Sequence, residues 1–151
     1  MTQAYTHNFS EVHQLGDYLQ PASRAIGTYN TAWISVQNHQ RGVFLLLTGA
    51  VGAGSTIDFA LQQATDIAGT GAKAFTPAKA ITQLTQAGSD SDKQVVVHVD
   101  AAELGDGYRY CRGRLTVGTA TSDAAVVAIA DHCRYKPTTD YDLSSVDEIV
   151  T

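Results

Sequence analysis

The stretch YRYCRGRLTV, residues 108–117, is the clearest strand in the sequence and sets the fold class. Successive side chains of a strand point to opposite sides of a sheet, and here alternate residues differ in character. One face is aromatic and basic, with Tyr108, Tyr110, Arg112, Arg114 and Thr116, whereas the other carries Arg109, Cys111, Gly113, Leu115 and Val117. The second face starts polar and then turns apolar, which predicts a strand that packs one face into a core.

Other short segments on both sides of this strand show the same period. Residues 57–62 (IDFALQ) and 94–100 (QVVVHVD) alternate, and extended structure is also expected at 29–36 and 124–135. Residues 43–47 (VFLLL) are apolar on both faces, which predicts a central strand covered on both sides, or otherwise a very buried strand. With regularly spaced turns between such segments, the chain is expected to be all-β: a single-domain antiparallel β-sandwich or jelly-roll-like barrel.

The ends differ in composition from the middle. Residues 1–20 are polar without a clear period and predict an extended N-terminal arm that ends at Pro21. The β domain is expected at residues 21–136. Residues 137–151 form an acidic C-terminal tail with four acids and no base.

Turn chemistry suggests how some strands connect. Residues 38–42 (NHQRG) resemble a hairpin turn, and Asp100 with Glu103 three residues later predicts one helical turn at 100–104. A hairpin centred on residues 121–122 would place Cys111 opposite Cys133. The two cysteines are then either packed thiols or a cross-strand disulfide formed after release into an oxidising medium.

Charge and motifs exclude several functions. Residues 1–136 hold 11 acids and 10 bases, so no net basic face is available for nucleic acid. The longest apolar run is far shorter than the ~20 residues of a spanning helix. The five histidines and two cysteines form no HxxxH, HxH or CxxC pair, and the sequence has neither a GxSxG elbow nor a phosphate loop. We therefore expect no catalytic site, metal site or cofactor.

Candidate contact residues remain. Tyr108, Tyr110, Arg112 and Arg114 have the composition of an interface hot spot, or of a solvated sheet face with cross-strand ion pairs. Trp33, the single tryptophan, belongs either to the core or to a contact surface. Asp140 and Asp142 are close in the acidic tail, where carboxylates are usually solvated and more rarely bind calcium weakly.

Several phrases in the middle of the chain resemble a family of small virion proteins of tailed bacteriophages, the head decoration or cement proteins. The phrases are STIDFALQQA (55–64), GTGAKA (69–74), AITQLTQ (80–86), VGTATS (117–122) and DHCRY (131–135). The resemblance covers roughly residues 30–136 and concerns phrase order, not a catalytic motif.

The resemblance implies a structural protein that is made in the host cytoplasm, binds the outside of an assembled capsid and clamps neighbouring subunits. Its partners would be the major capsid protein and other copies of itself. The expected contact surface comprises the tyrosine–arginine stripe, Trp33, the N-terminal arm and the acidic tail with Asp140 and Asp142. Two alternatives stay open: another virion component, such as a head–tail connector or tail protein, and a carbohydrate-binding β-sandwich that uses Trp33 and the tyrosines as stacking platforms.

Overall fold

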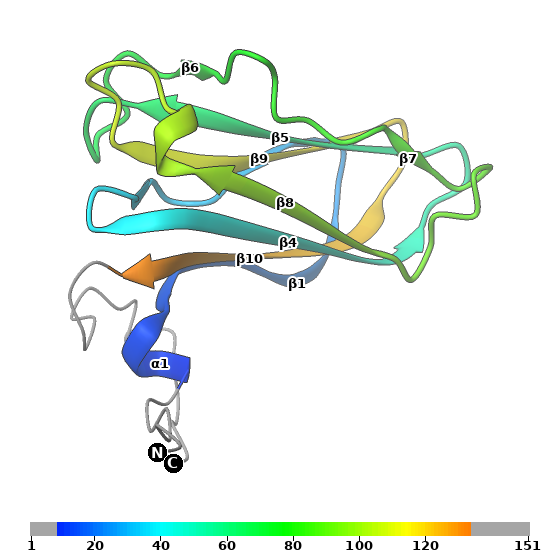
Figure 1. Cartoon of the computed structure of the whole chain (residues 1–151). Coiled ribbons are helices and arrows are strands. Elements are labelled where there is room, and N and C mark those ends of the chain that lie inside the picture. Colours follow the sequence, from blue (N-terminus) through cyan, green and yellow to red (C-terminus); the bar gives the residue numbers. More distant parts are fainter. Residues whose placement is uncertain (1–8, 134–151) are drawn as a thin grey trace.

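Two antiparallel sheets face each other in the computed structural model, which describes residues 9–133 and, for Cys133, only the backbone. Figure 1 shows the two layers, with β5 and β9 in one and β4, β10 and β1 in the other. The predicted all-β sandwich is thus confirmed. No helix within residues 9–133 is both long and apolar enough to cross a bilayer.

The four-stranded sheet runs in the order β1, β10, β4 and β8, with bounds Gln14–Arg24, Ser122–Cys133, His39–Val51 and Gln94–Asp100. The six-stranded sheet has the order β2, β9, β5 and β6, with bounds Gly27–Asn30, Tyr110–Gly118, Thr56–Ala64 and Lys73–Ala74. Its two remaining strands are β3, which pairs with β9, and β7, which pairs with β5; they span Ile34–Ser35 and Leu84–Thr85. Within residues 9–133, helical structure is limited to α1 (Phe9–Val12) and one 3-10 turn, Ala101–Glu103, where one helical turn is expected.

The core lies between the sheets and centres on two aromatic rings. Phe44 of β4 and Phe59 of β5 are fully buried, and their ring centroids lie 6.4 Å apart. Gly113 of β9 makes room for them, since a Cβ atom there would lie 2.6 Å from the Phe59 ring. The face of β9 that is expected to pack into the core does so: Cys111, Leu115 and Val117 are all buried.

The first sheet strand begins before the predicted boundary at residue 20. β1 runs from Gln14 to Arg24 and pairs with β10, so residues 14–20 belong to the sheet and not to an arm. Pro21 lies in the register shift between Leu19 and Ala22. Because β1 is an edge strand, a proline at an irregularity costs no ladder hydrogen bond there.

The expected hairpin around residues 121–122 does not form. β9 pairs with β5, β2 and β3, whereas β10 pairs with β1 and β4 in the other sheet. Cys111 therefore lies opposite Gln63 and Ile34, and the backbone of Cys133 lies opposite His39. The prediction that Cys111 faces Cys133 across a strand pair is wrong, because the connection between β9 and β10 changes sheets.

A second predicted hairpin also turns out to be a change of sheet. The turn at Gln37 and Asn38 joins β3 of the six-stranded sheet to β4 of the four-stranded sheet. The single strand expected at 29–36 is divided into β2 and β3, both paired with β9. β4 is central, as residues 43–47 predict, but only one of its faces is fully buried.

Candidate interaction surface

The outward side of the four-stranded sheet carries an apolar surface. The strand register aligns apolar residues in rows across β1, β10, β4 and β8. We call the set the outer apolar face: Leu15, Tyr18, Val43, Leu45, Leu47, Val96, Val127 and Ile129. All eight are half-buried or exposed, with Tyr18 43% and Val96 51% exposed.

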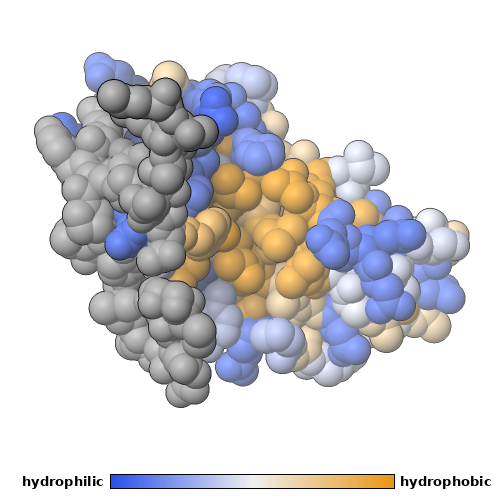
Figure 2. Space-filling model, turned by 60° about the horizontal axis from the view of Figure 1, so that its bottom comes forward, coloured by the Kyte–Doolittle hydropathy of each residue, from blue (hydrophilic) through white to orange (hydrophobic). Residues whose placement is uncertain are grey.

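Figure 2 turns the underside of Figure 1 forward and shows apolar side chains gathered in one patch on this side of the molecule. One row of the register crosses all four strands of the outer apolar face, from Tyr18 to Val127, Leu45 and Val96. Contiguous exposed apolar patches on proteins usually mark sites where another surface docks. The outer apolar face is therefore the strongest candidate interaction site among residues 9–133.

Sequence reasoning did not find this surface, although its signal was present. Residues 43–47 are apolar on both faces of the strand, which predicts burial on both sides. The structure buries Phe44 and Leu46 completely and leaves Val43, Leu45 and Leu47 half-buried on the outside. A strand apolar on both faces is equally compatible with a sheet that has one face in its own core and the other available to a partner.

The predicted stripe on β9 lies on the outward side of the opposite, six-stranded sheet. Its central residue, Arg112, already makes contacts within the chain. The guanidinium stacks 4.4 Å from the centroid of the Trp33 ring, and its Nε and Nη2 donate to Gln62 Oε1 at 3.0 and 2.8 Å. Burial, followed by the positive charge of Arg114, lowers the pKa of Arg112. The structure thus brings Trp33 and Arg112 together as one intramolecular cluster.

The other members of the stripe do not join that cluster. Tyr108 precedes β9; its hydroxyl donates to the Gly71 carbonyl at 3.2 Å, and Lys73 Nζ lies 4.3 Å from its ring centroid. Tyr110 is half-buried and Arg114 is exposed. Asp140 and Asp142 lie outside the described residues. No three His, Cys, Asp or Glu side chains gather as a metal site requires within the part of the chain that the structure describes.

Arg112→Ala is expected to lower the free energy of unfolding by about 1–2 kcal/mol, because a cation–π contact and both hydrogen bonds to Gln62 Oε1 are lost together. Trp33 is the sole tryptophan, so its emission should also change as the ring loses its cover. Urea unfolding followed by fluorescence measures both. Arg114→Ala is the matched control on the same face, with an expected effect within about 0.5 kcal/mol. Equal effects of the two variants would contradict the assignment.

Cys111 is fully buried, and burial raises the pKa of its thiol well above the usual value. Because the thiolate is the reactive species, native Cys111 should resist alkylation. Iodoacetamide treatment followed by peptide mass analysis should find Cys111 unmodified in the native protein and modified after unfolding in urea. Comparable native and unfolded labelling rates would show that the core around Cys111 is open.

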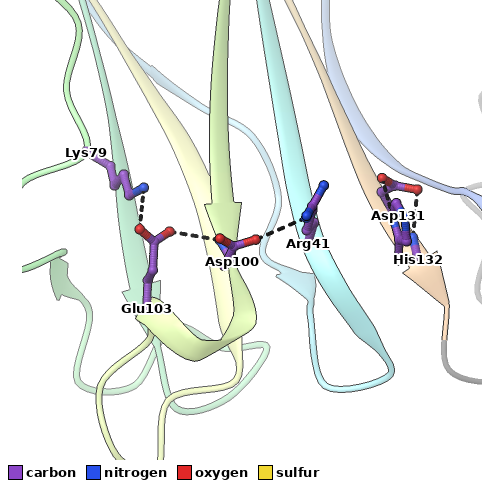
Figure 3. A network of polar contacts seen from close by, with 6 residues as sticks. All are labelled: Arg41, Lys79, Asp100, Glu103, Asp131 and His132. Carbon is purple, nitrogen blue, oxygen red and sulfur yellow. Dashed lines mark hydrogen bonds and ion pairs between the residues drawn. The ribbon is translucent and has the colours of Figure 1, made fainter.

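The carboxylate of Asp131, near the end of β10, holds α1 in place through His13, the residue that follows α1. Asp131 Oδ1 lies 2.8 Å from His13 Nε2, and Asp131 Oδ2 lies 2.6 Å from His132 Nδ1; Figure 3 shows the second of these contacts. Partial burial alone would raise the pKa of Asp131, but hydrogen bonds from His132 and the charges of both histidines together lower it. Phe9 stacks on His13 at 4.1 Å and completes this attachment.

Comparison with known proteins gives little beyond this geometry. No family model matches the chain, and no curated protein sequence matches it. One solved structure that matches is described as "Structure of infectious bursal disease virus Gx strain", with a TM-score of 0.44 and 12% sequence identity. The match covers 79% of this chain and 32% of that one, so this chain spans about a third of that protein's length.

Proposed function

We propose that this protein is a virion structural protein that binds the outer surface of a tailed-phage capsid and stabilises it. The observation that carries the proposal is the outer apolar face, an apolar surface on the outward side of the four-stranded sheet. The resemblance of several phrases to those of decoration proteins suggests the kind of partner. The partners of this protein would be the major capsid protein and further copies of itself. It would be located on the capsid surface.

The physical logic of such a role requires no reaction. A capsid repeats the same site many times, and a protein that contacts neighbouring subunits together gains affinity by avidity. A half-exposed apolar sheet face supplies burial energy at each site, at roughly 25 cal/mol for each Å² of apolar surface removed from water. We accordingly propose a binding role and not an enzymatic one.

The two alternatives predict different observations. A head–tail connector or tail protein would use the same kind of apolar face but be present in about a dozen copies per particle instead of hundreds. A carbohydrate-binding module would need an open aromatic platform, and the Trp33 ring is already stacked with Arg112. This intramolecular stacking favours the virion role over glycan binding.

The test is to mix the purified protein with capsids that lack it and to measure co-sedimentation and the temperature at which the capsids rupture. Saturable binding that raises the rupture temperature is the expected result. Absence of binding would overturn the decoration role, and binding at about a dozen sites per particle would assign the protein to the neck or tail.

A further inference from the structure

β8 is an edge strand without the usual protection. The other edge of the same sheet, β1, contains Pro21 and two register shifts, whereas β8 pairs with β4 in an unbroken register from Gln94 to Asp100. Residues 94–99 include no proline, lysine, arginine or acid. Natural edge strands usually carry a charge, a proline or a bulge that prevents further pairing. The absence of all three from residues 94–99 indicates that this part of the edge can accept another strand.

The register identifies which backbone groups face outward. Thr48 N–H donates to the Lys93 carbonyl at 2.9 Å, which makes these two residues a hydrogen-bonded pair next to the end of β8. Because such pairs alternate in an antiparallel ladder, Val95, Val97 and Val99 also bond to β4. The N–H and C=O groups of the intervening residues, Gln94, Val96 and His98, then point away from the sheet.

One end of this edge is closed by a polar network, shown in Figure 3. The Asp100 N–H donates to Glu103 Oε2 at 2.8 Å, and the Asp100 carboxylate lies 3.2 Å from Arg41 Nε. Glu103 in turn pairs with Lys79 at 2.6 Å. The outward edge that remains open is Gln94–His98, which we call the free edge.

A groove of about 640 Å³ runs beside the free edge, between β8 and residues 78–84 of the opposite layer. Ile81, Leu84, Val95 and Val97 line it, and all four are half-buried. An added strand would place every second side chain toward this groove. The space therefore accommodates the inward side chains of a strand that extends the four-stranded sheet.

We propose that the occupant of the free edge is the free edge of a second copy of this chain, paired antiparallel about a two-fold axis at Val96. In this register Gln94 faces the partner's His98, and Val96 faces the partner's Val96. Polar residues thus meet polar residues and apolar residues meet apolar ones. Each facing pair exchanges two backbone hydrogen bonds, as a hydrogen-bonded pair of an antiparallel ladder does.

The inward side of the same pairing is also matched. Val95 comes opposite the partner's Val97, and both point toward the apolar groove. A pattern that reads the same in both directions is what an isologous two-fold contact requires, and a foreign strand would not need it. This symmetry favours a second copy over a strand from another protein.

The dimer would join two outer apolar faces into one continuous surface, because Val96 stands in the same row as Leu45 and Val127. The inference does not depend on the virion role: the self-association of the purified protein tests it without a capsid. If the dimer forms and capsids do not bind, only the proposed function fails.

Sedimentation equilibrium of the full chain over a wide range of concentrations is the test. Wild type is expected to dimerise. Val96→Pro removes the outward N–H of residue 96, which makes no hydrogen bond to β4, so the sheet within one copy keeps its ladder. Val96→Lys places the lysines of the two copies directly opposite each other at the two-fold axis. Each variant should weaken dimerisation by about tenfold or more.

The matched control is Ile67→Lys, because Ile67 is 71% exposed and lies outside the four-stranded sheet. It should dimerise as wild type does, and circular dichroism should confirm that every variant is folded. A wild type that is monomeric throughout, or a dimer that folded Val96→Pro and Val96→Lys both leave intact, would overturn the inference. A monomer that instead binds a strand of another protein through β8 would also overturn it.

Discussion

Phe59→Ala is expected to lower the free energy of unfolding by about 3–5 kcal/mol. Phe59 is 1% exposed and packs between the sheets against Phe44, close to Gly113 of β9. Its removal leaves a cavity that the surrounding strands cannot close completely. Since domains are stable by only about 5–15 kcal/mol, the variant should be marginally folded.

Urea unfolding, with the midpoint and slope both fitted, measures this loss. Ile67→Ala is the control, because Ile67 is 71% exposed and its replacement should stay within about 0.5 kcal/mol of wild type. A loss below about 1 kcal/mol for Phe59→Ala would mean that the two sheets do not pack as described.

Leu45→Lys should reduce binding to capsids by about thirtyfold or more, equivalent to roughly 2 kcal/mol, if the outer apolar face docks there. Leu45 lies in the middle of the row that joins Val127 and Val96. A lysine in a closed apolar interface must bury its charge or hold the surfaces apart. In the free protein the half-exposed position lets the long side chain extend its ammonium group into water, so the fold should persist.

Arg114→Glu on the six-stranded sheet is the control for this prediction. It changes charge on the opposite side of the sandwich and should leave capsid binding nearly unchanged. The two variants can be compared by co-sedimentation at matched concentrations. Loss of binding with Arg114→Glu but not with Leu45→Lys would move the contact to the stripe on β9.

The strands with regular alternation could be predicted from the sequence. More buried and more exposed residues alternate along β5 up to Gln63 and along β8 and β9, and most of the more buried ones are apolar, so composition indicates which face meets the core. β1 could not be found in this way. Its two register shifts change the parity within the strand, and Gly16 and Pro21 resemble the punctuation of a loop.

The pairing of strands was harder to predict than their positions. A tight turn is expected to return the chain along its neighbour, and this expectation placed Cys111 opposite Cys133. In a sandwich the same short turn can instead carry the chain to the facing sheet, as it does after β3 and after β9. The period of the side chains is identical in both cases, so nothing in the local sequence distinguishes them.

The candidate site shows the same limit. Trp33 and Arg112 are candidate contact residues in the sequence, but their stacking on each other depends on β9 and the segment before β3 lying side by side. The outer apolar face depends on the order β1, β10, β4 and β8. A surface assembled from four strands distant in sequence appears only once that order is known.

Carbene footprinting of the protein, free and bound to capsids, tests the central claim most directly because it labels exposed side chains and locates them by mass. Bound protein should show reduced labelling at Tyr18 and at the outward residues of β4 and β10, with Ile67 and Arg114 unchanged. Reduced labelling confined to the six-stranded sheet, with Tyr18 as accessible as before, would contradict the account.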